Sequence, residues 1–503
     1  MYLRWDQQRP AVLLQSYTIS AAKMSPPLPS CVEVPVLLSK LNQTVKDAKD
    51  LACLNGFLMR TKENPDSSDV VSPAPFMLLP SSIPKHLFQT ALSIQPSINE
   101  LYFKVANDYD FLWKTLEGTI NVDEFTAKQW EIMKQVQTSG KKKSLQVGML
   151  RSDYMLDTAK SDDLSLSQVE VNTIAASFAG LASKIAPTHR LIIRQLSPET
   201  DVSKVPLNNA CSGLSEALYL AWKAYGNPQA VVVVFVDEDE RNIFDQRCQE
   251  VAITDFDPTI KVWRRSMEYV GANANLTEDD RITLDNEEVA VFYYRTGYVP
   301  TQFKSDLAWK SKLLAELSKA AVCPSIGWHL AGSKKVQQEL AQPGVLEKFM
   351  SDPEKIAAMR STFTGLYSLA LDAEGDAAAE KAIANPDKFV MKPQLEGGGN
   401  NIYKEEIRTT LQKTAGTADR SKYILMDRII PHSVKNYVIR PGYSHTETAD
   451  YVSEFGFYGS FVSLDDKVLL NKAAGHQVRT KQKNQDEGGV AVGVSSLNSP
   501  FLV

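Results

Sequence analysis

The chain has 503 residues, of which 43% are hydrophobic and 23% charged, and its formal net charge is −5. That length exceeds what one hydrophobic core normally supports, so we expect two or three domains. The acidic balance argues against nucleic acid as a partner, because the basic run at Lys141–Lys143 is short and typical of a solvated loop. No apolar run is long enough to span a membrane.

The five cysteines are scattered and form no Cys-x-x-Cys pair. A structural zinc site is therefore not expected. Their odd number and wide spacing fit a reducing compartment, so we expect a cytoplasmic location.

The N-terminal part divides into a leader and a helical region. Residues 1–29 are interpreted as a leader or disordered extension that ends in a proline-rich linker. The segment does not resemble a secretory signal, because polar residues interrupt its apolar run Ala11–Leu14. Helical patterns dominate from Val36 to Val136, with a proline-rich break at Ser72–Pro84. Within this region, Ile120–Val136 is expected to be one amphipathic helix.

Ser165–Val171 alternates well enough to be a strand. Glu170 and Asn172 are two residues apart, so they project to one face, opposite Val169 and Val171. A buried Glu-x-Asn pair at a strand end is a plausible cation site. An ordinary solvent-facing strand edge explains this segment equally well.

The middle of the chain alternates between helices and apolar runs. Ser212–Tyr225 is expected to be a helix with Gly226 just beyond its end. Ala230–Val236 is nearly continuously apolar, which is typical of a parallel strand buried on both faces. A helix over Arg241–Gln249 follows, and the next strands are expected at Thr259–Trp263 and Val289–Tyr294. These elements predict a small doubly wound α/β unit over residues 230–332.

Further elements are expected toward the C-terminus: a helix opening at Lys334–Leu340, a strand at Tyr423–Met426, and a hairpin of Tyr451–Leu464 with Val468–Leu470. The expected domains are an N-terminal helical and α/β part over residues 30–229, a substrate-binding α/β domain over residues 230–333, and a C-terminal domain over residues 334–503.

The most informative motif is Lys392–Asn401, in which three glycines follow an expected strand at Phe389–Met391. Glycines allow backbone N–H groups to approach an anion closely, and Lys392 supplies a point charge for phosphate. Glu396, directly before the glycines, is a hard oxygen ligand suited to Mg²⁺. The motif therefore favours a nucleotide triphosphate site over a plain flexible turn, although its spacing differs from that of a P-loop.

Several segments in order resemble the eukaryotic glutathione synthetases, a family within the ATP-grasp superfamily. They are Arg151–Leu156, Val169–Thr173, Arg241–Arg247, Tyr294–Tyr298, Leu330–Gln338, Lys392–Tyr403, Ile424–Met426, Arg479–Lys481 and Gly488–Ala491. The resemblance runs from about Val34 to the C-terminus. It implies an α/β ATP-grasp fold with a Rossmann-like substrate-binding insert and a glycine-rich lid near residues 392–425.

The resemblance also implies a reaction in which ATP phosphorylates the cysteinyl carboxylate of γ-glutamylcysteine. Glycine then attacks the acyl phosphate and gives glutathione, ADP and phosphate. The implied co-substrate is ATP, the implied cofactor is Mg²⁺, and the implied assembly is a homodimer. Two alternatives stay open: an ATP-grasp ligase with another donor or acceptor, and a paralogue that keeps the fold as a binding protein.

Site residues are carried over from the family one by one. Those implied to be catalytic are Arg151, Lys334, Lys392 and Arg479. The implied Mg²⁺ ligands are Glu170, Asn172 and Glu396. Implied ATP contacts are Glu170, Lys334, Lys392, Glu396, Gly397, Gly398, Gly399, Asn400, Asn401, Tyr403, Met426, Asp427, Arg428, Ile429, Glu454, Lys481 and Glu487. Implied substrate contacts are Arg151, Ala175, Ala176, Ser177, Glu240, Arg241, Asn242, Gln246, Arg295, Tyr298, Arg479, Val490 and Ala491.

Three positions depart from the family pattern. Ala175 replaces a usual serine, Ala179 a usual glycine or proline, and Leu395 a usual arginine beside the expected metal ligand. A lost neutral hydrogen bond costs on the order of 1 kcal/mol, so the first change should weaken substrate binding without abolishing it. Singly, Arg151 and Arg295 are also explained as structural ion pairs and Tyr298 as a core residue.

Overall fold

The computed structural model describes the chain except residues 1–27, 443–444, 446, 466 and 491–492. Most of the expected leader over residues 1–29, and Ala491 of the expected substrate loop, thus lie outside the described residues. No helix among the described residues is both long and apolar enough to cross a membrane.

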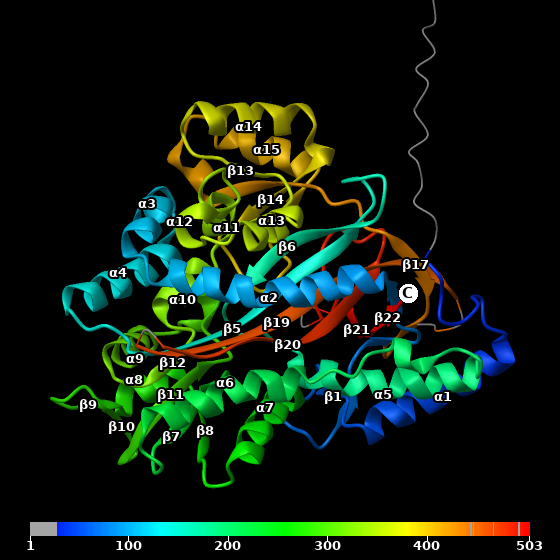
Figure 1. The fold of residues 1–503 in the computed structure, drawn as a ribbon, viewed down its shortest axis with the longest axis horizontal. Coiled ribbons are helices and arrows are strands. Elements are labelled where there is room, and N and C mark those ends of the chain that lie inside the picture. Colours follow the sequence, from blue (N-terminus) through cyan, green and yellow to red (C-terminus); the bar gives the residue numbers. More distant parts are fainter. Residues whose placement is uncertain (1–27, 443–444, 446, 466, 491–492) are drawn as a thin grey trace, which may run out of the picture.

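An eight-stranded sheet crosses the middle of the molecule (Figure 1). Its strand order is β18-β3-β21-β20-β19-β5-β6, and β17 also pairs with β19. The bounds are β3 Phe76–Met77, β5 Leu145–Asp157, β6 Ser165–Asn172, β17 Ser433–Asn436, β18 Val438–Ile439, β19 Ala449–Leu464, β20 Lys467–Gln482 and β21 Ser496–Asn498. The β19–β20 hairpin is the expected one, but its second strand extends well beyond Leu470.

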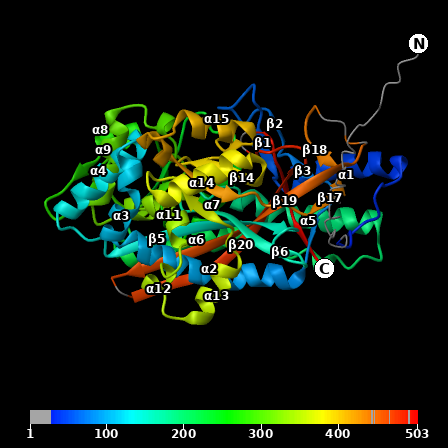
Figure 2. The same ribbon diagram turned by 90° about the horizontal axis from the view of Figure 1, so that it is seen from above.

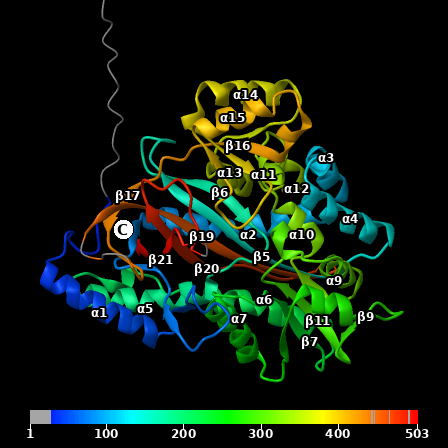
Figure 3. The same cartoon turned by 180° about the vertical axis from the view of Figure 1, so that it is seen from behind.

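Helices cover both faces of this sheet, which is why β5 and β19 are buried along almost their whole length. Phe457 and Phe461 pack with α2 (Lys85–Ala106) in one core. Val462 and Val147 lie on the opposite face and pack with α6 (Ala210–Tyr225) in another. Figures 1 and 3 show α2 and α6 on either side of the long strands.

A second, six-stranded sheet has a parallel centre. Strands β8 (Val262–Arg265), β7 (Val231–Phe235), β11 (Glu287–Tyr294) and β12 (Ala321–Cys323) run parallel, and β10 (Ile282–Leu284) and β9 (Asn275–Leu276) extend it antiparallel. Helices α6 and α7 (Ile243–Phe256) pack on one face, and α8 (Met267–Asn273) and α9 (Asp306–Leu317) on the other. The doubly wound unit expected from the apolar runs is present.

A third sheet is antiparallel, with order β13-β16-β14-β15. The bounds are β13 Leu366–Ser368, β14 Phe389–Pro393, β15 Ile402–Tyr403 and β16 Tyr423–Asp427. Helices α14 (Ala373–Ala384) and α15 (Glu405–Lys413) pack on its outer face. Its inner face lies over the central sheet, and Figure 2 shows the layers from above.

The remaining elements complete the mixed α/β fold. They are α1 Leu38–Leu54, β1 Leu58–Arg60, β2 Val71–Pro73, β4 Ser81–Ile83, α3 Tyr109–Ile120, α4 Glu124–Thr138, α5 Ala179–Leu196, α10 Ile326–Ala331, α11 Lys334–Leu340, α12 Leu346–Phe349, α13 Pro353–Ser361 and β22 Pro500–Leu502. Strand β22 pairs with β4, so the C-terminal residues lie beside the start of α2.

Three expected boundaries were wrong. Ile120–Val136 is not one helix, because α3 ends at Ile120 and Asp123 caps a new helix by accepting from the backbone N–H of Thr126 at 2.7 Å. The strand expected from Thr259 starts at Val262, after Asp257 has accepted from the Thr259 N–H in a turn. The helix expected over Arg241–Gln249 starts at Ile243 and continues to Phe256.

Candidate active site

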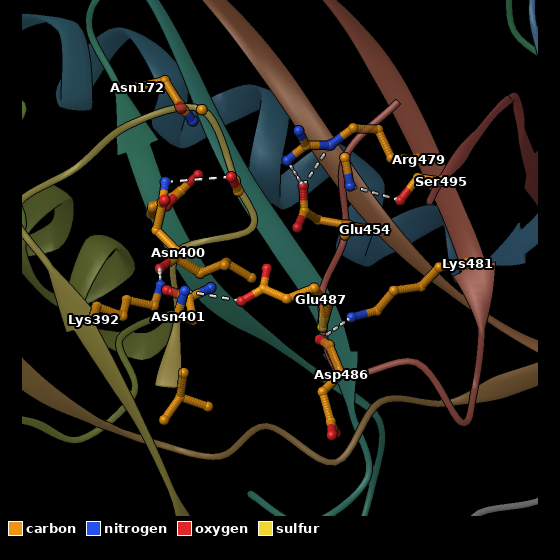
Figure 4. Close-up of a pocket in the computed structure, with 18 of the residues that line it drawn as sticks. Asn172, Lys392, Asn400, Asn401, Glu454, Arg479, Lys481, Asp486, Glu487 and Ser495 are labelled. Atoms are coloured by element: carbon orange, nitrogen blue, oxygen red, sulfur yellow. Dashed lines mark hydrogen bonds and ion pairs between the residues drawn. The ribbon is translucent and has the colours of Figure 1, made fainter. Parts of the chain in front are cut away.

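A pocket of about 270 Å³ lies between the central sheet and the antiparallel sheet. Strands β5, β6, β19 and β20 contribute one wall, and β14, β16 and the residues after β14 contribute the opposite wall. The segment after β20 closes one side, as Figure 4 shows. The pocket thus joins residues from both ends of the sequence.

Strand register places the charged side chains of the first wall in rows. Asp153 pairs with Glu170 on β6 and with Gly456 on β19, while Arg151 pairs with Asn172. Alternate residues of a strand share a face, so these charged residues lie on the same face of β5 and β19 as the apolar residues that pack on α6. Along each strand, this face changes from apolar core to polar pocket wall. Val171 packs in the opposite core as expected, whereas Val169 lies at a register shift and also lines the pocket.

Two arginines on this wall are held by carboxylates. Arg151 is buried and forms a bidentate pair with Asp153, at 2.7 Å from Nε to Oδ1 and 2.8 Å from Nη2 to Oδ2. Arg479 donates to Glu454, with 2.9 Å from Nε to Oε1 (Figure 4). It also donates to Asp153 at 3.0 Å. Burial raises the pKa of Glu454, although Arg479 opposes this shift. Arg151 therefore forms the buried ion pair that one interpretation of the sequence expected, and it also lines the pocket.

Lys334 lies between two carboxylates. Its Nζ is 2.8 Å from Glu396 Oε1 and 3.2 Å from Glu170 Oε2, and only 4% of its side chain is exposed. Burial lowers the pKa of Lys334, but the two carboxylates outweigh burial and raise it. Burial tends to raise the pKa of Glu170, yet Lys334 and Lys392 hold it well below its usual range. The pKa of Glu396 is raised by burial and by Glu170, against the effect of Lys334.

Lys392 is the second buried ammonium of the pocket. Its Nζ donates to the backbone carbonyl of Val169 at 2.8 Å, and no carboxylate pairs with it among the ion pairs of the described residues. Burial lowers its pKa. A buried ammonium with only a carbonyl partner strongly favours an incoming anion, as phosphate would be.

The expected metal ligands form an oxygen-rich corner. Glu170 and Glu396 contact the same ammonium, so their carboxylates already converge on one positive charge. Asn172 donates its Nδ2 to Asp153 at 2.9 Å and to the Arg151 carbonyl at 3.3 Å, which leaves Oδ1 as the end available to the pocket. Two carboxylates and an amide oxygen fit Mg²⁺, which prefers oxygen ligands and keeps several waters.

The glycine-rich segment is held by the segment after β20. Gly397, Gly398 and Gly399 have φ of 97°, 73° and 80°, a left-handed conformation that side chains disfavour. The backbone N–H groups of Gly399 and Asn401 donate to the two carboxylate oxygens of Glu487 at 3.0 and 2.9 Å. Figure 4 shows the contact of Asn401. These N–H groups already bind an anion, which shows that the segment is built to receive negative charge.

At the end of the pocket beside β15 and β16, polar contacts join the segment after β20 to the antiparallel sheet. Asp486 pairs with Lys404 at 2.6 Å and with Arg428 at 2.9 Å, and its carbonyl accepts from Lys481. Tyr403, Met426, Asp427 and Ile429 line this end. An aromatic ring, a thioether and an aliphatic side chain beside charged groups suit a purine nucleotide.

A polar cluster lies beside the pocket at the start of α5. Asp245 accepts from the backbone N–H groups of Phe178 and Gly180, both at 2.8 Å, and from Arg295 at 2.9 Å. It therefore caps a helix whose own N-cap residue, Phe178, has no suitable side chain. Arg295 also donates to Ser177 at 3.1 Å, which connects the cluster to the pocket lining.

The structure brings most of the predicted site residues to this pocket. Those that line it are Arg151, Glu170, Asn172, Ala175, Ser177, Tyr298, Lys334, Lys392, Glu396, Gly397, Gly398, Asn400, Asn401, Tyr403, Met426, Asp427, Arg428, Ile429, Glu454, Arg479, Lys481, Glu487 and Val490. Predicted residues outside the described lining are Ala176, Glu240, Arg241, Asn242, Gln246, Arg295 and Gly399. Their roles stay predictions.

The sequence reasoning missed Asp153, Asp245 and Asp486. The signal for Asp153 was available, because it lies two residues after Arg151 and shares its face once β5 is assigned as a strand. Asp245 and Asp486 act through contacts with segments distant in sequence, so local pattern gave no signal for them.

Comparisons with known proteins agree over nearly the whole chain. The family described as eukaryotic glutathione synthase, ATP binding domain, matches residues 38–502. A glutathione synthetase from Xenopus laevis is 43% identical over 464 residues, covering 92% of this chain and 97% of the relative. The Homo sapiens glutathione synthetase is 42% identical over 465 residues with the same coverage.

More distant relatives extend the pattern. A chloroplastic glutathione synthetase from Arabidopsis thaliana is 38% identical over 471 residues, covering 92% of this chain and 86% of the relative. A solved structure described as a glutathione synthetase like-effector from Globodera pallida, in apoform, matches with a TM-score of 0.75 over 95% of this chain and 100% of its own. At 24% identity, that likeness supports the fold alone.

Proposed function

The chain belongs to the eukaryotic glutathione synthase family, and we propose that it catalyses the ATP-dependent ligation of γ-glutamylcysteine and glycine. The cysteinyl carboxylate takes the γ-phosphoryl group of ATP and becomes an acyl phosphate. The glycine amine then attacks the carbonyl carbon and displaces phosphate, which leaves glutathione and ADP. The chain thus acts as an ATP-dependent carboxylate–amine ligase.

One observation carries this proposal: Lys334, Lys392, Glu170 and Glu396 converge on one pocket with the glycine-rich segment. Two ammonium groups and the backbone N–H groups stabilise the negative charge of the triphosphate as it redistributes during transfer. The enzyme's task in this reaction is positioning and charge neutralisation.

The substrates are assigned to two ends of the pocket. ATP places its base near Met426 and Ile429, and its phosphates reach Lys392 and the glycine-rich segment. The dipeptide carboxylate lies toward Arg151 and Arg479, whose guanidinium groups suit a carboxylate. The segment over Gly488–Val490 closes beside it and keeps water from the acyl phosphate.

Glu170, Asn172 and Glu396 would hold Mg²⁺, which when bound neutralises phosphate charge and orients the transferred group. In the structure, Lys334 neutralises the two carboxylates. We also propose that the protein is a homodimer and works in the cytoplasm. Sedimentation of the purified protein and localisation of a tagged chain test these two points.

The function is tested by ADP release from the purified protein with ATP and Mg²⁺, leaving out γ-glutamylcysteine and glycine in turn, with mass detection of the product. We expect release only when both are present, with glutathione as product. Binding of ATP without any release in the presence of both would contradict the proposal. Because Ala175 and Leu395 line the pocket, a screen of other γ-glutamyl donors and amines is then the next step.

A further inference from the structure

Asp153 lies behind the pocket wall, where its carboxylate contacts three side chains that line the pocket. It has 0% exposure and accepts four hydrogen bonds. Two come from Arg151 at 2.7 and 2.8 Å, one from Arg479 at 3.0 Å and one from Asn172 at 2.9 Å. The donors come from β5, β20 and β6, so one carboxylate joins three strands.

The bond to Asn172 determines which end of its amide faces the pocket. A side-chain amide has one donor end and one acceptor end. Because an ionised carboxylate only accepts, Asp153 holds the Nδ2 end, and Oδ1 is the end that remains for a cation. The Arg151 carbonyl reinforces this orientation by accepting from the same Nδ2 at 3.3 Å.

A glycine on β19 leaves room for the Asp153–Arg151 ion pair. Gly456 lies opposite Asp153 in the strand register. A Cβ on Gly456 would lie 2.6 Å from Asp153 Oδ1 and 2.9 Å from Arg151 Cδ, which is closer than real Cβ contacts. The absence of a side chain at this position therefore permits the ion pair beside it.

We propose that Asp153 is a positioning residue for Mg²⁺-dependent nucleotide binding. Its carboxylate fixes the Asn172 amide with the oxygen toward the cation. The same carboxylate holds the two guanidinium groups that face the substrate. It touches no reacting atom, and its effect passes through the residues that it holds. This inference rests on the proposed function and assigns a role to a residue that the family resemblance did not supply.

The test compares nucleotide binding with and without Mg²⁺ in the full-length protein by calorimetric titration of ATP. Asp153→Asn keeps the size of the side chain but replaces one carboxylate oxygen with an NH₂ group. This donor would face the N–H groups of Arg151, Asn172 and Arg479, which now donate to the carboxylate. Loss of a group that orients a metal ligand typically costs about 10–100-fold in metal affinity or activity. We expect the Kd for ATP with Mg²⁺ to rise at least fivefold, whereas the Kd without Mg²⁺ changes less than twofold.

Asp157→Asn is the matched control. Asp157 is also buried on β5, but it accepts from Ser167 at 2.9 Å and from the Ala159 N–H instead of from Asn172 and the two arginines. We expect less than a twofold change in both Kd values for this variant. Equal changes in the two variants, or equal changes with and without Mg²⁺ in Asp153→Asn, overturn the proposal because they indicate general loss of sheet structure.

Gly456→Ala provides a second route if Asp153→Asn does not fold. It keeps every charge and crowds the Asp153–Arg151 pair most closely, with Gln477 Cγ next at 3.1 Å. The same Mg²⁺-specific rise in Kd is expected. A rise below fivefold overturns the proposal. Because binding is read without turnover, a wild-type protein that releases no ADP would refute the proposed function and still leave this comparison readable.

Discussion

Removing the ammonium between the two pocket carboxylates should destabilise the ligand-free protein. In Lys334→Met, Glu170 and Glu396 lose the charge that both contact, at 3.2 and 2.8 Å. Breaking a fully buried ion pair costs about 3–5 kcal/mol. The two carboxylate side chains are 21% and 17% exposed, so water compensates in part and we expect about 2–3 kcal/mol.

The loss should depend on pH. The pKa of Glu396 is raised by burial, so its stabilising contribution is present below the ordinary pKa and is lost as pH rises through the folded value. The pKa of Glu170 is depressed, so its contribution is present above the ordinary pKa. Without Lys334, Glu170 loses much of that benefit and both carboxylates prefer a proton. The destabilisation should therefore be larger at pH 7.5 than at pH 5.

Thermal unfolding with and without Mg²⁺, at both pH values, measures this effect. Mg²⁺ should raise the Tm of Lys334→Met more than that of the wild type, because the ammonium no longer competes for the two carboxylates. Lys335→Met is the control. Lys335 is the next residue in the chain, and among the hydrogen bonds and ion pairs of the described residues its ammonium contacts only the neutral groups Gln338 Oε1 and Ser368 Oγ, so its removal leaves no carboxylate without a partner. A Tm for Lys334→Met equal to that of the control at both pH values would refute the reasoning.

Three further outcomes are expected. Glu487→Ala removes the carboxylate that accepts from Gly399 and Asn401, so hydrogen exchange of these two backbone N–H groups should accelerate roughly tenfold, and unchanged rates would contradict the contact. Leu395→Arg adds a positive charge to the pocket lining and should tighten ATP binding about fivefold at low salt, an effect that salt weakens and that Leu395→Gln lacks. Gly148→Ala places a Cβ 2.7 Å from Trp328 Cζ2 and should lower the free energy of unfolding by about 1–3 kcal/mol, measured with denaturant. Adding Trp328→Phe to the same chain should restore part of this loss. Wild-type stability of the single variant would disprove the clash.

Most of the pocket lining was expected only from the resemblance to the family. The residues themselves predicted the doubly wound unit, from the continuous apolar run of β7, and a phosphate site, from the glycine-rich segment after β14. Helix α11 was expected at Lys334–Leu340 and is found there, since Ser333 caps it by accepting from the Val336 N–H.

Other features depend on tertiary contacts and leave no local signal. Strand β5 was not expected, because burial on both faces removes the alternation that reveals a strand. The contacts of Lys334 and of the glycine-rich N–H groups also could not be predicted from local pattern, since Glu170, Glu396 and Glu487 reach them from distant segments. The break between α3 and α4 is different, because Asp123 supplies a local capping signal, but the apolar pattern continues across the break and suggested one helix.

The strand order of the central sheet has a consequence for biogenesis. Arg479 and Asp153 are 326 residues apart in sequence, yet the Arg479 guanidinium donates to the Asp153 carboxylate in the folded protein. A growing chain therefore carries the phosphate lysines long before the β19–β20 hairpin exists to complete the pocket. Substrates bound only by the complete pocket cannot stabilise earlier intermediates. Such late, long-range pairing is slow, so the nascent chain should depend on chaperones rather than on its ligands until the last strands have been made.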